Sequence, residues 1–154
     1  VYTGSKNLED AVEGVAVDAG KLVLSPTRTY APVMKAILDA FSPQEIHGAV
    51  HCSGGAQTKV LHFIDSGHII KDNMFPIPPL FKMIQAESKT DWREMYKVFN
   101  MGHRLELYIA PENADSIIEI AKSFAIDAQI VGRVAEHPTK KLTLSTPNGT
   151  FEYA

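Results

Sequence analysis

The segment from Arg104 to Ile109 constrains the fold most, because apolar and polar side chains alternate along it without interruption. Leu105, Leu107 and Ile109 fall on one side of an extended chain, and the polar residues fall on the other. This period of two predicts a strand in a sheet with one buried face. Shorter patterns predict further strands at 46–52, 69–70, 128–134, 141–145 and 150–153, the last two joined by a hairpin at 147–149.

Helical periodicity appears between these strands. Apolar residues recur at helical spacing or follow helix-start signals in five segments, which are 32–41, 60–64, 80–85, 92–99 and 111–124. Thr29 is the expected N-cap of the first helix, and Asp91 with Glu94 forms a capping box at the fourth. Helices that alternate with strands, followed by a terminal strand pair, predict an α+β domain whose mixed sheet is covered by helices.

Length and charge limit the classes of function. The chain has 154 residues, which predicts one domain over 1–154, with 1–23 as a less regular lead-in. Its net charge of -3 disfavours a nucleic-acid platform, and no apolar run approaches the roughly 20 residues that cross a membrane. We therefore expect a cytoplasmic protein. The absence of an initiator Met indicates a fragment.

The cysteine and histidine residues do not predict a metal site. The single cysteine, Cys52, excludes both a disulfide framework within the chain and a cysteine zinc cage, and it is expected to be a small apolar filler. The six histidines show no His-x-x-x-His spacing. No metal ligand is therefore assigned.

The best candidate for chemistry is the run from His51 to Gly55, where a predicted strand enters a glycine pair and then a helix. Ser53, Gly54 and Gly55 could hold a phosphate with backbone amides, or form no more than a tight turn. His51 at the strand end could donate a hydrogen bond or act as a general acid or base. The alternative is a partly buried histidine satisfied by a neighbour.

Two other segments allow a functional and a structural interpretation. The turn from Asn100 to Gly102 is either a plain loop or a second backbone loop facing the first, with Arg104 able to hold a phosphate. Thr27 and Arg28 could bind an anionic ligand. They could equally cap the following helix and pair with a surface acid.

Four ordered segments, taken together, carry a family resemblance. They are 24–30, 49–55, 78–85 and 94–102, and the last contains Met95-Tyr96-Lys97-Val98-Phe99-Asn100-Met101-Gly102. From about Leu24 to Gly132 the chain resembles the C-terminal domain of phosphoribosylformylglycinamidine cyclo-ligases, also called aminoimidazole ribonucleotide synthetases. The resemblance implies that domain's fold and ATP-dependent closure of the imidazole ring of formylglycinamidine ribonucleotide in purine biosynthesis.

The resemblance also implies partners and site residues. ATP and Mg2+ are expected on an acidic N-terminal domain outside this chain, the substrate is a phosphorylated small molecule, and the full-length enzyme is a homodimer. The family's histidine-glycine loop falls on His51 and Ser53–Gly55, and its Phe-Asn-Met-Gly turn includes Asn100 and Gly102. Arg104 stands where the family has a second glycine. The segment after Gly55 also departs from the family pattern.

Other functions stay open at this level. The alternatives within the superfamily are formylglycinamide ribonucleotide amidotransferase, selenophosphate synthetase and a hydrogenase-maturation protein. A non-catalytic binding module that kept the fold is an alternative of another class. An acidic nucleotide-binding domain upstream in the same reading frame would argue against that module. The isolated chain is expected to be inactive in ring closure.

Overall fold

The computed structural model describes residues 4–26 and 28–154, so the site residue Thr27 lies outside the described residues. Within them, short helices and strands alternate along the chain, as the sequence patterns predict. In chain order the elements are α1 (Ala19–Val23), α2 (Ala31–Ala40), β1 (Ile46–His51), the 3-10 helix η1 (Ala56–His62), β2 (Gly67–Lys71), α3 (Pro79–Ser88), α4 (Trp92–Val98), β3 (Leu105–Ile109), the 3-10 helix η2 (Pro111–Asn113), α5 (Ala114–Ser123), β4 (Gly132–Ala135), β5 (Lys140–Thr146) and β6 (Gly149–Tyr153).

The strands form two sheets. One has four strands in the order β4-β2-β5-β6, in which β2 and β5 run parallel and the other pairs are antiparallel. The other is the antiparallel pair β1-β3. Thr146 pairs with Gly149 across the last turn, which confirms the predicted hairpin. The α+β class with a mixed sheet is therefore confirmed, with β1 and β3 set apart from the main sheet.

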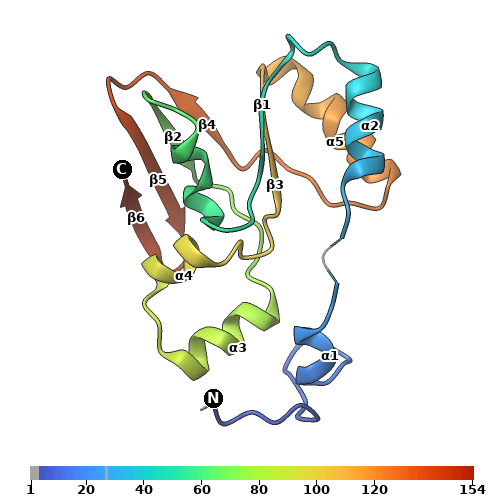
Figure 1. Ribbon diagram of the computed structural model, residues 1–154, viewed down its shortest axis with the longest axis vertical. Coiled ribbons are helices and arrows are strands. Elements are labelled where there is room, and N and C mark those ends of the chain that lie inside the picture. Colours follow the sequence, from blue (N-terminus) through green and yellow to red (C-terminus); the bar gives the residue numbers. More distant parts are fainter. Residues whose placement is uncertain (1–3, 27) are drawn as a thin grey trace.

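The β1-β3 pair lies between two apolar cores (Figure 1). On one side α2 and α5 contribute Ile37 and Ile117, against which Leu107 and Ile109 pack. On the other side Val50 joins the core beneath the four-stranded sheet. The prediction of a single buried face for the 104–109 strand was wrong, because both faces are covered and Glu106, on the polar side, is only 5% exposed.

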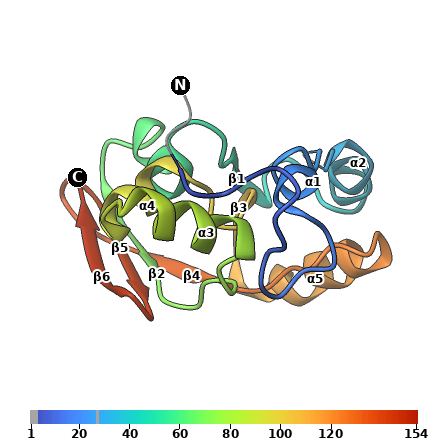
Figure 2. The same ribbon diagram turned by 90° about the horizontal axis from the view of Figure 1, so that it is seen from below.

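Helices α3 and α4 close the far side of the main core, where Figure 2 shows them beside each other. Met95 and Tyr96 of α4 are fully buried. Asp91 accepts a hydrogen bond from the Arg93 amide at 2.8 Å, so the predicted cap is present, while Glu94 pairs with Lys97 instead of reaching back. The predicted Thr29 cap of α2 was wrong. The residue at that position is Tyr30, without a side-chain capping bond, and a proline in the first turn sets the helix start.

The strand predicted at 128–134 starts later, at Gly132, which lies opposite Lys71, the last residue of β2, and touches that strand closely. A Cβ built on Gly132 would lie 1.9 Å from the Ile70 carbonyl oxygen and 2.9 Å from the Lys71 Cα. Only a residue without a side chain allows β4 to pair with β2 at this point. Gly132 therefore fixes where the edge strand begins.

Gly132→Ala should lower the free energy of unfolding by about 2–3 kcal/mol, since the methyl group meets backbone atoms that cannot turn aside. Chemical denaturation of the purified protein measures this change. Gly54→Ala is the matched control, because a Cβ there meets nothing within 4 Å and its expected effect is below about 0.5 kcal/mol. Equal effects of the two substitutions would contradict this explanation of the strand start.

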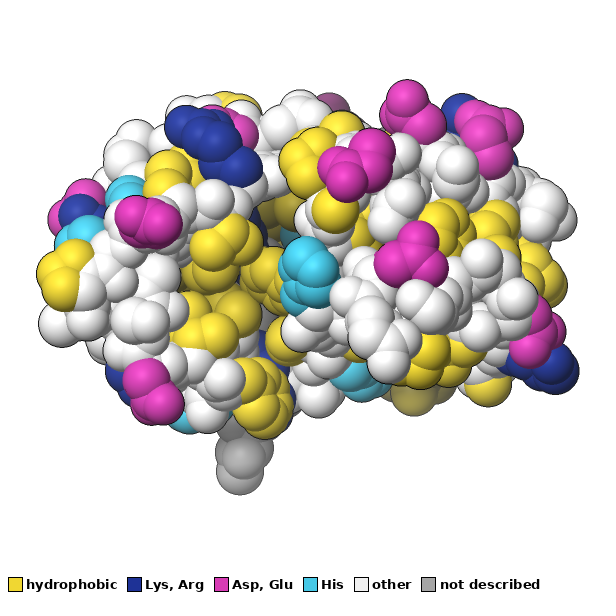
Figure 3. All heavy atoms as spheres, turned by 90° about the horizontal axis from the view of Figure 1, so that it is seen from above, with side chains coloured by type: hydrophobic (Ala, Val, Ile, Leu, Met, Phe, Trp, Pro, Cys, Tyr) yellow, Lys and Arg dark blue, Asp and Glu magenta, His cyan; other side chains and the backbone are white. Residues whose placement is uncertain are grey.

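One face of the molecule is hollowed between the four-stranded sheet and the α2-α5 side, and hydrophobic side chains gather in the hollow (Figure 3).

No helix in the described part of the chain has the length and apolar character needed to cross a bilayer. The site described below lies at the ends of β1 and β3, where these strands meet the main core.

Candidate functional site

The two predicted loops meet because their strands pair. β1 ends where β3 begins, with His51 opposite Leu105, and the Cys52 amide donates to the Arg104 carbonyl at 2.8 Å. In an antiparallel pair, the segment that leaves one strand lies beside the segment that enters the other. The structure therefore brings the loop at Ser53–Gly55 next to the turn at Asn100–Gly102.

The glycine pair has two different roles. Gly55 has φ +92°, a left-handed conformation that glycine adopts without strain, and it leads into η1. Gly54 is exposed, and a Cβ built on it would meet no atom within 4 Å. The backbone conformation at position 55 therefore accounts for the glycine there. The surface above Gly54 is open to an approaching ligand. Ser53 is exposed beside it.

The second turn is fixed by its own hydrogen bonds. The Asn100 Oδ1 accepts from the Gly102 amide at 2.9 Å, a turn typical of Asn. Gly102 has φ +89°, and a Cβ on it would lie 2.8 Å from Pro78 Cγ. The turn thus requires both residues for its shape, and the proline-rich connector packs against it.

The remaining predicted site residues lie away from the buried side of the loops. His51 is exposed, and its ring meets the Tyr30 ring edge-on, with the centroids 6.3 Å apart. Arg28 donates to the Ala125 carbonyl oxygen at 2.7 Å, a contact that ties it to the end of α5. Among the described residues, Arg104 is half-buried and its guanidinium forms no ion pair.

A buried polar network lies directly behind the two loops. Lys71, at the end of β2, and Glu106, on β3, form an ion pair at 2% and 5% exposure. The Lys71 ammonium also donates to both the backbone oxygen and Oε1 of Gln57, at 3.0 and 3.1 Å. The Gln57 Nε2 then donates to the Asn100 carbonyl at 2.8 Å. The first loop is thereby tied to the second through a side chain.

The Glu106 carboxylate is charged because its partners outweigh its burial. Burial alone raises the pKa of this group, but the hydrogen bond from His103 and the charge of Lys71 hold the pKa at about 2. The Tyr108 hydroxyl donates to Glu106 Oε2 at 2.6 Å, and burial followed by the Glu106 charge raises the pKa of Tyr108. Burial also raises the pKa of Cys52 to about 12, so its thiol is protonated and unsuited to nucleophilic attack.

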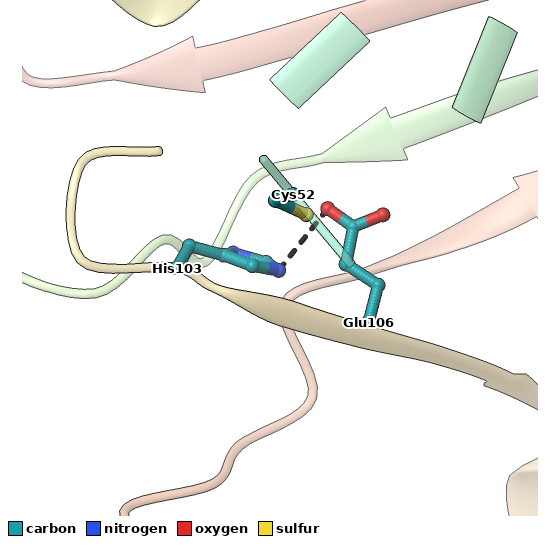
Figure 4. Close-up of side chains that lie close together, drawn as sticks. All are labelled: Cys52, His103 and Glu106. Atoms are coloured by element: carbon teal, nitrogen blue, oxygen red, sulfur yellow. Dashed lines mark ion pairs between the residues drawn. The ribbon is translucent and has the colours of Figure 1, made fainter. Parts of the chain in front are cut away.

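His103 is held in one orientation by Glu106 (Figure 4). The His103 Nε2 lies 3.1 Å from Glu106 Oε1 and must be the donor, because the carboxylate carries no proton. The other ring nitrogen, Nδ1, is buried without a partner among the described residues. An unsatisfied buried polar atom costs about 1–3 kcal/mol, so His103 Nδ1 lowers the stability of the fold.

Cys52, His103 and Glu106 are the only described residues that form a group with metal-ligand geometry, their ligand atoms lying within 4.8 Å of one another. The group does not fit a cation. The Lys71 ammonium already bonds to Glu106, and the Cys52 thiol holds its proton. Magnesium in particular prefers carboxylate oxygens and water, and this group offers one carboxylate. This group therefore does not suit a magnesium ion.

Sequence reasoning missed Gln57, Lys71 and Glu106. Glu106 occupies the polar side of an alternating strand, which is the ordinary pattern of a solvent-facing residue. Lys71 follows the apolar pair Ile69-Ile70 and resembles a charged strand end. The pairing of the two charges depends on contacts between different sheets, which a pattern within one strand does not contain.

Comparison with known proteins identifies the family of the chain. A family model described as "AIR synthase related protein, C-terminal domain" matches residues 3–145. Similar curated proteins include the phosphoribosylformylglycinamidine cyclo-ligases of Syntrophus aciditrophicus, 31% identical over 90% of this chain and 40% of the relative, and of Methanocaldococcus jannaschii, 35% identical over 74% of this chain and 32% of the relative. The cyclo-ligase of Methanococcus vannielii is 34% identical over 75% of this chain and 32% of that protein.

The family match over residues 3–145 places this domain in the superfamily of ATP-dependent enzymes related to aminoimidazole ribonucleotide synthetase. The chain belongs to the AIR synthase related C-terminal domain family. It spans between about a third and two fifths of the length of the curated relatives named above.

Proposed function

We propose that the chain is the substrate-side domain of a phosphoribosylformylglycinamidine cyclo-ligase, which closes the imidazole ring of formylglycinamidine ribonucleotide in purine biosynthesis. The observation that carries the proposal is the meeting of the loop at Ser53–Gly55 with the turn at Asn100–Gly102 in a chain of this family. The named cyclo-ligases are similar to this chain over most of its length.

The reaction explains why two backbone loops are useful. The amide oxygen of the substrate is a poor leaving group, and transfer of the γ-phosphoryl group of ATP to it yields ADP and an activated carbon. The amidine nitrogen of the same molecule then attacks that carbon, phosphate departs, and loss of a proton gives the aromatic ring. Such chemistry depends on holding the reacting groups and the anionic phosphates in place.

In this proposal the phosphorylated substrate contacts the open surface above Gly54. Ser53 contributes a hydroxyl and Gly55 shapes the loop, while Asn100 and Gly102 form the opposite wall. His51 lies at the strand end beside the first loop, in position for proton handling. Thr27 and Arg28 remain candidate anion ligands on the segment before α2.

ATP and Mg2+ are assigned to another part of the full-length protein. The one group of potential metal ligands found among the described residues contains a single carboxylate, that of Glu106, which supports this assignment. We also propose that the full-length enzyme is a cytoplasmic homodimer. Both proposals rest on the family resemblance stated in the sequence analysis.

The test is an assay of the full-length protein for formation of aminoimidazole ribonucleotide, with ADP release that requires formylglycinamidine ribonucleotide. His51→Ala should lower kcat by about tenfold to a hundredfold, as expected for loss of a proton-handling group. It should leave the melting temperature unchanged, because the ring is exposed. Equal losses of activity and stability, or an unchanged kcat, would return His51 to a structural role. Absence of ring closure in the wild-type protein would overturn the proposal.

A further inference from the structure

Gln57 joins the two loops from inside the protein. It is fully buried, at 0% exposure, in the first turn of η1, two residues after Gly55. Its Nε2 donates to the carbonyl oxygen of Asn100, the residue that begins the second turn. A side-chain amide that lies 43 positions from its partner in the sequence therefore connects the segments that carry the proposed phosphate-binding glycines.

Lys71 determines which way this amide points. Its ammonium donates to Gln57 Oε1 at 3.1 Å, so the oxygen of the amide is directed toward the charge. The NH2 group is then directed toward Asn100, where an acceptor is required. The ammonium also donates to the Gln57 backbone oxygen and to Glu106, which accounts for all three of its protons. Gln57 is therefore held at its backbone as well as at its side chain.

Glu106 anchors the arrangement on the strand that leaves the second turn. Its carboxylate receives Lys71, the His103 Nε2 and the Tyr108 hydroxyl, so the buried charge is fully solvated by protein donors. A charge pair buried to this degree tolerates little displacement, because any movement leaves a charge without a partner. The position of Gln57 is consequently fixed relative to β2 and β3 together.

We propose that Gln57, oriented by the Lys71-Glu106 pair, is a positioning residue that holds Gly54-Gly55 and Asn100–Gly102 at the separation required by one phosphorylated ligand touching both. This inference rests on the proposed function for its ligand, but the coupling of the two loops belongs to the free protein. Gln57 does not touch the ligand. It acts through the loop at Ser53–Gly55, which ends two residues before it in the chain, and through the Asn100 carbonyl to which it donates.

The test is Gln57→Met in the full-length protein, a change that keeps the side-chain volume and removes both amide hydrogen bonds while leaving the Lys71-Glu106 pair in place. Gln129→Met is the matched control, because Gln129 Nε2 also bonds to a distant carbonyl, that of Asn73 at 2.6 Å. Hydrogen exchange by mass spectrometry compares peptides over 52–58 and 99–104 with peptides of α2 and α5. Steady-state kinetics gives KM for formylglycinamidine ribonucleotide and kcat.

Loss of a buried hydrogen bond should speed exchange in both loop peptides by about tenfold and leave α2 and α5 unchanged. KM should rise by about tenfold while kcat changes less, and the Gln129 control should alter neither. Faster exchange in one loop alone, in neither loop, or uniformly in all peptides would overturn the proposal. If the wild-type protein lacks ring closure, the proposed function fails, while the exchange measurements still decide whether Gln57 couples the loops.

Discussion

Lys71→Met should lower the free energy of unfolding by about 3–5 kcal/mol at pH 7, the largest stability effect that we expect from a substitution in this chain. The change leaves the Glu106 carboxylate buried at 5% exposure without the Lys71 ammonium that pairs with it. Desolvation then raises its pKa, whereas in the native protein the His103 bond and the Lys71 charge keep that pKa at about 2. Chemical denaturation of the two proteins measures the difference.

The pH dependence identifies the cause. In the native protein Glu106 has a pKa below its ordinary value of 4.5, so its contribution is fully present above about pH 4.5 and is lost as the pH falls toward 2. In Lys71→Met the carboxyl gains a proton readily at low pH, and the difference between the two proteins should therefore shrink below pH 4.5. A difference that stays constant over this range would assign the loss to packing.

The ion pair of Lys141 with Glu152 supplies the control. Lys141 Nζ lies 2.8 Å from Glu152 Oε1, but the Glu152 side chain is 62% exposed. Lys141→Met should cost less than about 1 kcal/mol. Adding Glu106→Gln to Lys71→Met should restore part of the lost stability, because it removes the unpaired charge. A loss below about 1 kcal/mol for Lys71→Met alone would contradict the buried network.

Gly54→Asp should raise KM for formylglycinamidine ribonucleotide by at least about tenfold, the largest effect on substrate binding that we expect. The new carboxylate would stand on the open surface of the first loop, where the substrate phosphate is proposed to bind. The free energy of unfolding should change by less than about 0.5 kcal/mol, because a Cβ on Gly54 meets nothing within 4 Å.

Gly54→Asn separates charge from size, since its side chain matches that of Asp in shape and is neutral. It should raise KM much less than Gly54→Asp. Gly55→Ala provides a second comparison, this time of stability. In contrast to the substitutions at Gly54, it should lower the free energy of unfolding by about 1–2 kcal/mol, because the φ of +92° at this position is unfavourable for alanine. An unchanged KM in Gly54→Asp would remove the phosphate from this loop.

Local patterns in the sequence predicted most of the secondary structure. The strands at Leu105–Ile109 and Lys140–Thr146 and the helix at Ala31–Ala40 follow from periodicity and from nearby turn or proline signals. The start of β4 did not, because it depends on how closely Gly132 approaches Ile70 of another strand. Periodicity describes one segment at a time and contains no information on such contacts.

For the candidate site, too, the local motifs could be recognised in the sequence, whereas the contacts between strands could not. The sequence left open whether the turn at Asn100–Gly102 faces the loop at Ser53–Gly55. The structure places the two side by side because β1 pairs with β3. The network of Gln57, Lys71 and Glu106 was not predicted, because alternation assigns Glu106 to solvent. Whether a charge is buried depends on whether a partner from another strand meets it, and only the fold determines that.

The central claim is that the two loops form one binding wall for the phosphorylated substrate of a ring-closing enzyme. A crystal structure of the full-length protein with formylglycinamidine ribonucleotide tests it most directly. The account predicts that the substrate phosphate lies within hydrogen-bond distance of the Gly54 and Gly55 amides, with the ligand also touching Asn100–Gly102. A substrate bound elsewhere, with both loops open to solvent, would contradict it.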